Sequence, residues 1–175
     1  MLLEEHLEVL YLFNVGDKIV YPSQGVGIID VIEEKEFSGK LQKYYKIHLI
    51  NNNLKLLLPA NRSEICHLRL ISDSKHLDKV LNNITKFTKN LEELISNDCK
   101  IRLQNNTLKF KSGTLEDFVE VVSDLTTISK DHNLNTSEKQ MLNTTKKFLI
   151  NEIKLSKNIS NDEATHLLNS SLALI

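Results

Sequence analysis

Residues 13–27 read FNVGDKIVYPSQGVG, and this stretch decides the fold. Gly16-Asp17 is a turn signal, because Gly accepts a positive φ and Asp bonds its own backbone. Residues 18–21 are rich in β-branched and aromatic side chains, which suit a half-buried strand. Pro22 lacks a backbone donor and ends that strand, and the glycines that follow let the chain turn sharply into a second one. The pattern predicts a small, strongly curved β-barrel.

The β pattern continues to about residue 71. Residues 44–50 alternate, with Tyr45, Ile47 and Leu49 on one face, which is typical of a half-buried strand. Asn51-Asn52-Asn53 tolerates the left-handed conformation of a hairpin turn. Tight turns then join short strands, as in a small barrel or rolled sheet. The strands are expected at residues 18–21, 26–32, 44–50, 54–58 and 65–70.

Residues 73–175 change character, because they contain a single glycine and no proline. Apolar residues recur at helical spacing, which predicts a helix from Leu77 that continues through Ile95. Ser112-Gly113-Thr114 marks a helix end and a new N-cap. Later helices are expected over residues 115–125, from Asn135 or Thr136 through Lys157 with Glu138 in the first turn, and over 161–172. The layout is a β module followed by a helical module, with a boundary near Asp73.

Composition restricts the possible functions. The formal net charge is −1, so bulk charge says nothing about a polyanionic partner. Cys66 and Cys99 have neither disulfide-framework nor metal-ligand spacing, and a reducing cytoplasm is the simplest compartment. Residues 1–12 contain three glutamates and lack the features of a signal peptide, so we interpret them as a short extension. No stretch is long and apolar enough to predict a membrane span.

Catalytic and cofactor motifs do not stand out. The serines and histidines show no nucleophile-base-acid pattern, and Cys66-His67 are adjacent rather than spaced as metal ligands. Gly25-Val26-Gly27 is not followed by a phosphate-binding signature. The sequence therefore predicts a protein that is not an enzyme and uses no cofactor and no metal.

Basic residues form two rows in the helical module. The first contains Lys100, Arg102, Lys109 and Lys111, with no acidic residue between Cys99 and Lys111. The second falls within an arc of about 100° of the helix that begins near residue 136, at 3.6 residues per turn. It consists of Lys139, Lys146, Lys147, Lys154 and Lys157. Such rows can bind phosphates without reading sequence, but they are also typical of an ordinary solvated helix face.

Several motifs resemble those of the CarD/CdnL family of bacterial RNA polymerase-binding transcription regulators. They are Val15 to Pro22 with Gly25-Val26-Gly27, His76-Leu77-Asp78-Lys79-Val80, Lys111-Ser112-Gly113, Val119-Glu120-Val121-Val122 with Asp124-Leu125, and Ser137-Glu138-Lys139 with Met141-Leu142. The β module alone is also similar to the polymerase-interacting domain of transcription-repair coupling factors. The resemblance implies an α+β fold, with a small Tudor/SH3-like β-barrel over residues 13–72 and a compact all-α domain over residues 73–175.

For the β module, the resemblance implies contact with the β subunit of RNA polymerase through an exposed strand edge. Lys35 matches a basic contact position of the family. Leu57 replaces another basic residue, so Leu57 and nearby Lys55 are candidates for a less polar contact. An exposed strand is a natural place for a partner's strand to add.

For the helical module, the resemblance implies contact with promoter DNA at the upstream edge of the melted bubble, where family members place a Trp as an apolar wedge. That position falls near Cys99, and this chain has no Trp. Arg102 matches one residue of the family's basic pair, and Lys139 matches the Lys of its Glu-Lys helix opening. With residues from the two rows, the predicted DNA contacts are Cys99, Lys100, Arg102, Lys109, Lys139 and Lys146.

The sequence thus predicts a monomeric, cytoplasmic transcription regulator that binds the RNA polymerase β subunit. It is expected to contact promoter DNA largely independently of sequence and to change the stability of the open complex. The alternative is a protein–protein adaptor on the polymerase without DNA contact, which the missing Trp favours.

Overall fold

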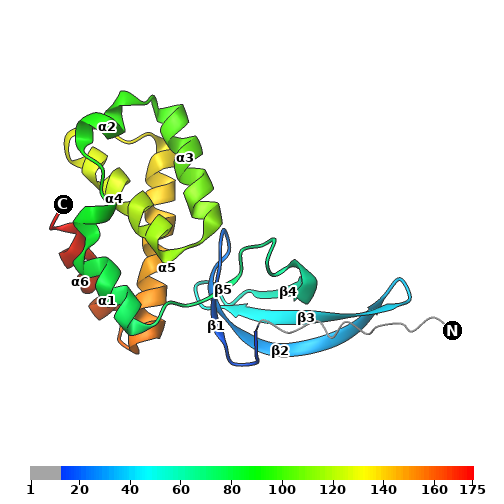
Figure 1. The fold of residues 1–175 in the computed structure, drawn as a ribbon. Coiled ribbons are helices and arrows are strands. Elements are labelled where there is room, and N and C mark those ends of the chain that lie inside the picture. The colour runs from blue at the N-terminus through cyan, green and yellow to red at the C-terminus, as the bar shows by residue number, and fades with distance from the viewer. Residues whose placement is uncertain (1–12) are drawn as a thin grey trace.

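A five-stranded antiparallel sheet precedes six α-helices in the computed structural model, which describes residues 13–175 (Figure 1). The predicted α+β class is confirmed. The extension expected over residues 1–12 lies outside the described residues. The strands are β1 (Lys18–Tyr21), β2 (Gly25–Phe37), β3 (Lys40–Leu49), β4 (Lys55–Pro59) and β5 (Arg69–Leu70), with a 3₁₀ turn, η1 (Ala60–Arg62), after β4.

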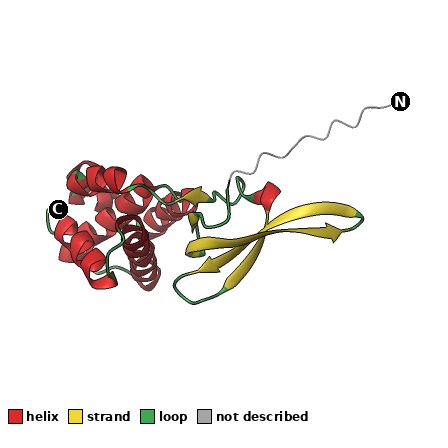
Figure 2. Cartoon of the chain, turned by 90° about the horizontal axis from the view of Figure 1, so that it is seen from below, coloured by secondary structure: helices red, strands yellow, loops and turns green. Residues whose placement is uncertain are grey.

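The sheet has the strand order β4-β3-β2-β1-β5, which leaves β4 and β5 at its edges. A bulge between Ile29 and Val31 lets the long β2–β3 hairpin bend. β4 pairs with β3 only between Tyr44 and His48, so the outer part of the hairpin projects as a two-stranded ribbon (Figure 2). In the described part of the chain, β4 therefore presents an open edge.

The core of the sheet confirms the alternation predicted for residues 44–50. Tyr45, Ile47 and Leu49 are buried, and Phe13 packs edge-on against Tyr45 with ring centroids 5.8 Å apart. Gly27 allows β2 to approach β3 closely, because a Cβ there would lie 2.7 Å from the carbonyl oxygen of His48. Packing between the two strands thus requires glycine at this position.

The last strand is shorter than predicted. Of residues 65–70, only the last two pair with β1. The residues before them form a turn in which the Cys66 N–H donates to the Arg62 carbonyl and the Leu68 N–H to the Ser63 carbonyl. His67 has a φ of 53°, and this left-handed backbone ends any extended segment there.

Each α-helix begins after a residue whose side chain accepts a backbone N–H of the first turn. Asn135 and Glu138 form a capping box, which confirms the helix start predicted there. The helices are α1 (Ser74–Asn82), α2 (Leu91–Ser96), α3 (Cys99–Ser112), α4 (Leu115–Asp131), α5 (Thr136–Lys157) and α6 (Asn161–Leu172).

The helix predicted from Leu77 through Ile95 is divided, so this prediction was wrong. α1 ends at Asn82, a 3₁₀ turn η2 (Ile84–Phe87) follows, and α2 is separate. The Asn83 side chain donates to the carbonyl of Lys79 at the end of α1, and the Asp124 carboxylate accepts the N–H of Lys89. Side chains that bond to the backbone in this way compete with helical hydrogen bonds.

The helical core extends into the sheet. Phe110 and Phe118 have ring centroids 5.6 Å apart, and Phe110 also stacks on Phe148. Val20 of β1 and Val26 of β2 are fully buried, and they belong to this helical cluster rather than to the separate core of the sheet. The sheet and the helices therefore share one apolar core at the place where they meet.

Candidate functional site

Two residues predicted to bind polymerase, Lys55 and Leu57, lie on the exposed face of the sheet. In the register of β3 and β4 they are opposite His48 and Lys46. Because alternate residues of a strand share a face, and opposite residues of an antiparallel pair do too, all four side chains point away from buried Tyr45. We call this the outer face. Leu57 is 43% exposed on it.

Lys35 lies on the same outer face, farther along the projecting hairpin. It is opposite Gln42, which alternates along β3 with Lys46. The ammonium of Lys35 is 3.0 Å from the Glu33 carboxylate, so a neighbour on the same face partly balances its charge. Lys35 therefore offers a partner less charge than a free lysine would.

Along β4, the backbone N–H and C=O groups of alternate residues point either toward β3 or toward the open edge. The Leu49 N–H donates to the Leu54 carbonyl at 2.8 Å, so the ladder between β3 and β4 uses residues 54, 56 and 58 of the chain. The N–H and C=O groups of Lys55 and Leu57 consequently point away from β3, toward the open edge. These two residues thus present both backbone groups and side chains to a partner.

In the helical module, α3 and α5 lie side by side and run in the same direction. Near their first turns, Arg102 donates to Glu138 at 2.9 and 3.1 Å, and near the end of α3, Phe110 stacks on Phe148 with centroids 5.5 Å apart. An open groove of about 250 Å³ separates them, lined by Leu103, Thr107, Phe110, Ser137, Gln140, Met141 and Thr144. The groove is lined by uncharged side chains, so basic residues of α3 and α5 can lie beside it but not in it.

Lysines flank this groove without exposed acidic neighbours on the two helical segments. Lys100, Thr107 and Lys111 follow one stripe of α3, and Lys147 continues the stripe of Gln140 and Thr144 on α5. The only acidic residue in residues 99–112 and 136–147 is Glu138, which is 1% exposed and paired with Arg102. We call this surface the α3–α5 face. Its exposed cations are Lys100, Lys111 and Lys147. Lys139 is also exposed, but it lies about 100° around α5 from Gln140, on the side away from the groove.

Two of the predicted DNA contacts turn inward instead. The Arg102 side chain is 15% exposed and also donates to the Asn97 carbonyl at 2.8 Å. Lys109 is 2.5 Å from a Glu120 carboxylate oxygen and 3.7 Å from that of Asp124. Both charges are balanced within the module. Lys111 and Lys147 belong to the same two rows, and they lie on the α3–α5 face where Arg102 and Lys109 do not.

The other predicted contacts differ in exposure. Cys99 is exposed as the first residue of α3, and Lys100 and Lys139 are exposed near it, because the Arg102–Glu138 pair holds the starts of α3 and α5 together. This end of the module lies farthest from the sheet, about 20 Å along α3 from its last residue. Lys146 is half-buried, and burial lowers its pKa.

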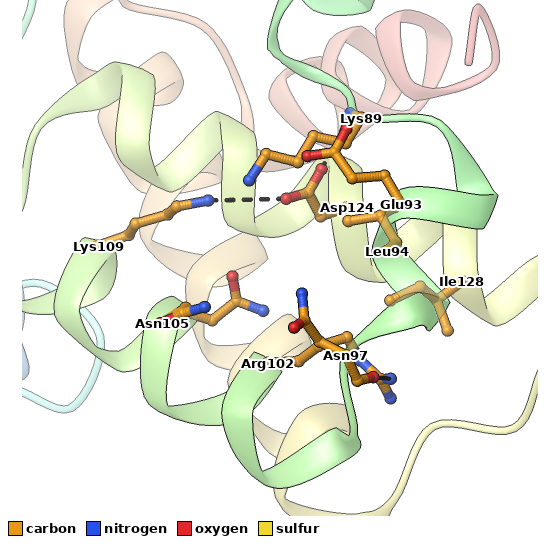
Figure 3. Close-up of a pocket in the computed structure, with 10 residues that line it drawn as sticks. Lys89, Glu93, Leu94, Asn97, Arg102, Asn105, Lys109, Asp124 and Ile128 are labelled. Carbon is orange, nitrogen blue, oxygen red and sulfur yellow. Dashed lines mark hydrogen bonds and ion pairs between the residues drawn. The ribbon is translucent and has the colours of Figure 1, made fainter.

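A small polar cavity lies between α2, α3 and α4 (Figure 3). Its volume of about 50 Å³ is far below that of a cofactor site. Asp124 accepts the N–H of Lys89 there, and burial raises the pKa of its carboxyl although Lys109 is near. We interpret the cavity as an internal polar contact that fixes α3. Among residues 13–175, no three His, Cys, Asp or Glu side chains converge as metal ligands, and no helix combines the length and apolar character of a membrane span.

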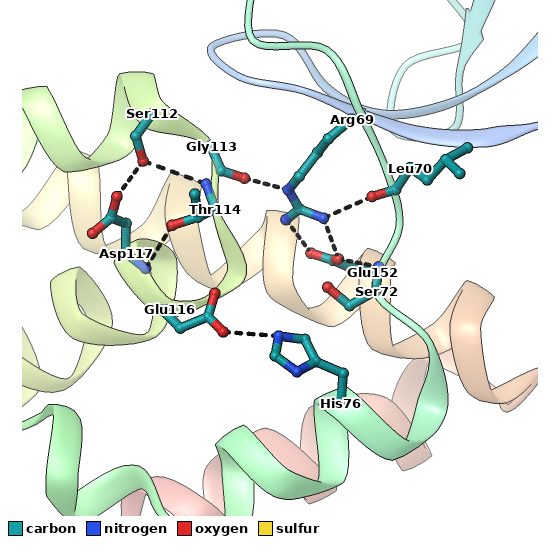
Figure 4. A network of polar contacts seen from close by, with 10 residues as sticks. All are labelled: Arg69, Leu70, Ser72, His76, Ser112, Gly113, Thr114, Glu116, Asp117 and Glu152. Atoms are coloured by element: carbon teal, nitrogen blue, oxygen red, sulfur yellow. Dashed lines mark hydrogen bonds and ion pairs between the residues drawn. The ribbon is translucent and has the colours of Figure 1, made fainter. Parts of the chain in front are cut away.

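One ion pair joins the sheet to the helices (Figure 4). Arg69 of β5 donates to the two carboxylate oxygens of Glu152 at 2.7 and 2.9 Å, and to the Gly113 carbonyl at 2.5 Å. Glu152 of α5 is fully buried and also accepts the N–H of Ser72 at 2.8 Å. The Arg69 guanidinium carbon lies 5.9 Å from the ring centroid of Phe118. We call the Arg69–Glu152 pair the joint contact. Sequence reasoning missed its role, because the two residues are 83 positions apart.

Two family models and a related protein match most of this chain. Residues 13–72 match the CarD-like/TRCF RID domain, and residues 82–169 match the CarD C-terminal domain. A Bacillus subtilis (strain 168) protein named "Putative transcription factor YdeB" is 36% identical over 149 residues, which cover 85% of this chain and 95% of that protein. The resemblance inferred from short motifs is confirmed, and so is the prediction of a regulator rather than an enzyme. The chain belongs to the CarD family of transcription regulators.

Proposed function

We propose that this regulator docks on the β subunit of RNA polymerase through the β4 edge and the outer face. The α3–α5 face then contacts promoter DNA at the upstream edge of the transcription bubble, largely independently of sequence. In this arrangement a cytoplasmic monomer changes the stability of the open complex.

The position of Lys55 and Leu57 carries the polymerase part of the proposal. Their backbone groups face the open edge, and the Leu57 side chain is exposed on the outer face. A partner strand that pairs here gains main-chain hydrogen bonds and an apolar contact together. The match of residues 13–72 to the CarD-like/TRCF RID domain supports RNA polymerase as the partner.

The α3–α5 face supports the DNA part. It offers exposed lysines, hydroxyls and amides, and the one acid in its two helical segments is buried and paired. Lysines of this kind bind phosphates whatever the base sequence, so they position a duplex without selecting it.

A bound regulator can shift the promoter only by preferring one of its states. If the α3–α5 face meets DNA better in the open complex than in the closed one, the open complex gains stability. A difference of about 1.4 kcal/mol in binding free energy changes that equilibrium about tenfold.

A second candidate function is an adaptor that binds polymerase without touching DNA. The observation that favours it is the internal pairing of Arg102 with Glu138 and of Lys109 with Glu120. An effect of the full chain on open-complex lifetime that does not depend on the exposed α3–α5 lysines would support this candidate.

The proposal is tested by capture of purified polymerase and of its β subunit on immobilised protein. Leu57→Pro removes the outward N–H while leaving the ladder to β3, so we expect capture to weaken at least about tenfold with an unchanged circular dichroism spectrum. Leu57→Ala keeps that N–H and serves as the control for the side chain, with a smaller loss expected. Equal capture by Leu57→Pro and the parent protein would refute the β4 edge as the docking surface.

A further inference from the structure

We propose that Arg69 and Glu152 are positioning residues, whose ion pair holds the α3–α5 face at a fixed place relative to the β4 edge. The inference rests on the proposed function, because it concerns how docking on polymerase is coupled to the promoter. Neither residue belongs to the outer face or to the α3–α5 face as defined above. The pair therefore affects binding only by setting the position of the helical module relative to the sheet.

The remaining contacts between sheet and helices are largely apolar and do not fix an orientation by themselves. Val20 and Val26 pack into the helical cluster, and apolar burial is non-directional. The joint contact adds direction, because a planar guanidinium meets both oxygens of one carboxylate in a single arrangement. The Nε donation to Gly113 brings the turn between α3 and α4 into that arrangement.

The burial of Glu152, whose partner Arg69 is 22% exposed, also argues for positioning. A buried ion pair seldom stabilises a fold more than apolar side chains of similar volume would. Removing one partner, however, strongly lowers the stability, because the other charge is left buried and unpaired. Glu152 is fully buried and receives N–H donors from β5 and from the link that follows it. Such a site specifies an arrangement more than it adds stability.

The link between β5 and α1 is held by the same carboxylate. It comprises only residues 71–73, and the N–H of Ser72 donates to Glu152. Two further hydrogen bonds reach α5: Lys18 of β1 donates to the Leu155 carbonyl at 3.2 Å, and the Asn151 amide donates to the Asn51 side chain between β3 and β4. The short link and its hydrogen bond thus restrict rotation of the helical module relative to the sheet.

The first test measures the joint directly in the full chain. Cys66→Ser and Arg62→Cys leave two labelling sites, one in η1 and one at exposed Cys99, for pulsed electron paramagnetic resonance. We expect a narrow distance distribution in this parent and a broader one after Glu152→Gln or Arg69→Lys. Asp78→Asn is the matched control, since it removes a carboxylate from an ion pair with Lys157 inside the helical module, and it should leave the distribution narrow.

The second test compares the unlabelled variants for β-subunit binding and open-complex lifetime. If the pair positions the α3–α5 face, Glu152→Gln should bind the β subunit as the parent does. Its effect on open-complex lifetime should be about tenfold smaller, equivalent to about 1.4 kcal/mol. Asp78→Asn should keep both. Arg69→Lys provides the same test if Glu152→Gln does not fold.

Unchanged distance distributions, or a promoter effect that survives their broadening, would overturn the positioning role. Failure of the parent protein to bind polymerase would instead overturn the proposed function and, with it, the coupling. The distances would then still report whether the pair orders the joint, so the two failures are distinguishable.

Discussion

Pro22 lies so close to Gly113 that a Cβ on Gly113 would be 2.2 Å from Pro22 Cγ. Gly113 also has a φ of 73°, in the left-handed region that strains other residues. The first corner of the sheet and the end of α3 therefore fit together only without a side chain at residue 113. A residue that the sequence marks as a helix stop is at the same time a contact between sheet and helices.

Gly113→Ala is expected to lower the free energy of unfolding by about 2–4 kcal/mol, because the left-handed backbone and the overlap with Pro22 each cost about 1–3 kcal/mol. Gly39→Ala is the matched control, since Gly39 has a φ of 75° and nothing within 4 Å of an added Cβ. Urea unfolding of both variants measures the difference. Equal losses would contradict a tight contact at Pro22.

Lys147→Gln is expected to weaken binding to a promoter duplex and to reduce the slope of log K against log salt by about 0.9, as for one lost phosphate contact. The neighbouring Lys146→Gln should change the slope little, because Lys146 is half-buried and its pKa is lowered. Fluorescence anisotropy of a labelled duplex over a salt series measures both. A larger effect from Lys146 would place the DNA surface elsewhere.

Asp124→Asn is expected to change how stability depends on pH. Burial raises the pKa of Asp124 above its ordinary 3.8, so the folded state binds this proton more tightly than the unfolded state. The contribution of Asp124 to stability therefore falls as pH rises from 3.8 through the raised pKa. Asn does not ionise and still accepts the Lys89 N–H.

The difference in unfolding free energy between Asp124→Asn and the parent should consequently shift in favour of the variant across that window and level off above it. Urea midpoints measured from about pH 4 to 8 give this difference. A constant difference over the whole range would show that the carboxyl titrates alike in the folded and unfolded states.

Val26→Ala is expected to lower the free energy of unfolding of sheet and helices together, by about 2 kcal/mol. Val26 lies on β2 but is buried in the helical cluster. Tyr21, Tyr44 and Tyr45 lie on the sheet, no tyrosine follows residue 45, and Trp is absent. After Tyr11→Phe in both proteins, tyrosine fluorescence therefore reports the sheet and far-ultraviolet circular dichroism mainly the helices. Two separate transitions in these signals would contradict a shared core.

Local signals in the sequence predicted most of the fold. Asn135 and Glu138 mark the start of α5 through contacts three residues apart, and Gly113 marks the end of α3. The division between α1 and α2 was missed in part because one of its contacts, from the Lys89 N–H to the Asp124 carboxylate, joins residues 35 positions apart. Short-range patterns do not report a hydrogen bond of that kind.

The candidate site was predictable in part for the same reason. Lys100 and Lys139 stand out as basic residues and are exposed, whereas Arg102 looked equally free because its partner Glu138 is 36 residues away. Lys55 and Leu57 were named from sequence, but the direction of their backbone groups follows from the pairing of β3 and β4.

Because sheet and helices share a core, a rotation of the sheet also moves the far end of the helical module. Helix α3 carries Lys100 about 20 Å beyond the contact between Gly113 and Pro22. A tilt of about 5° on the polymerase would move that lysine sideways by nearly 2 Å, more than a hydrogen bond tolerates. If the protein binds polymerase and DNA as proposed, the angle at which the sheet docks therefore sets the position of Lys100 on the nucleic acid.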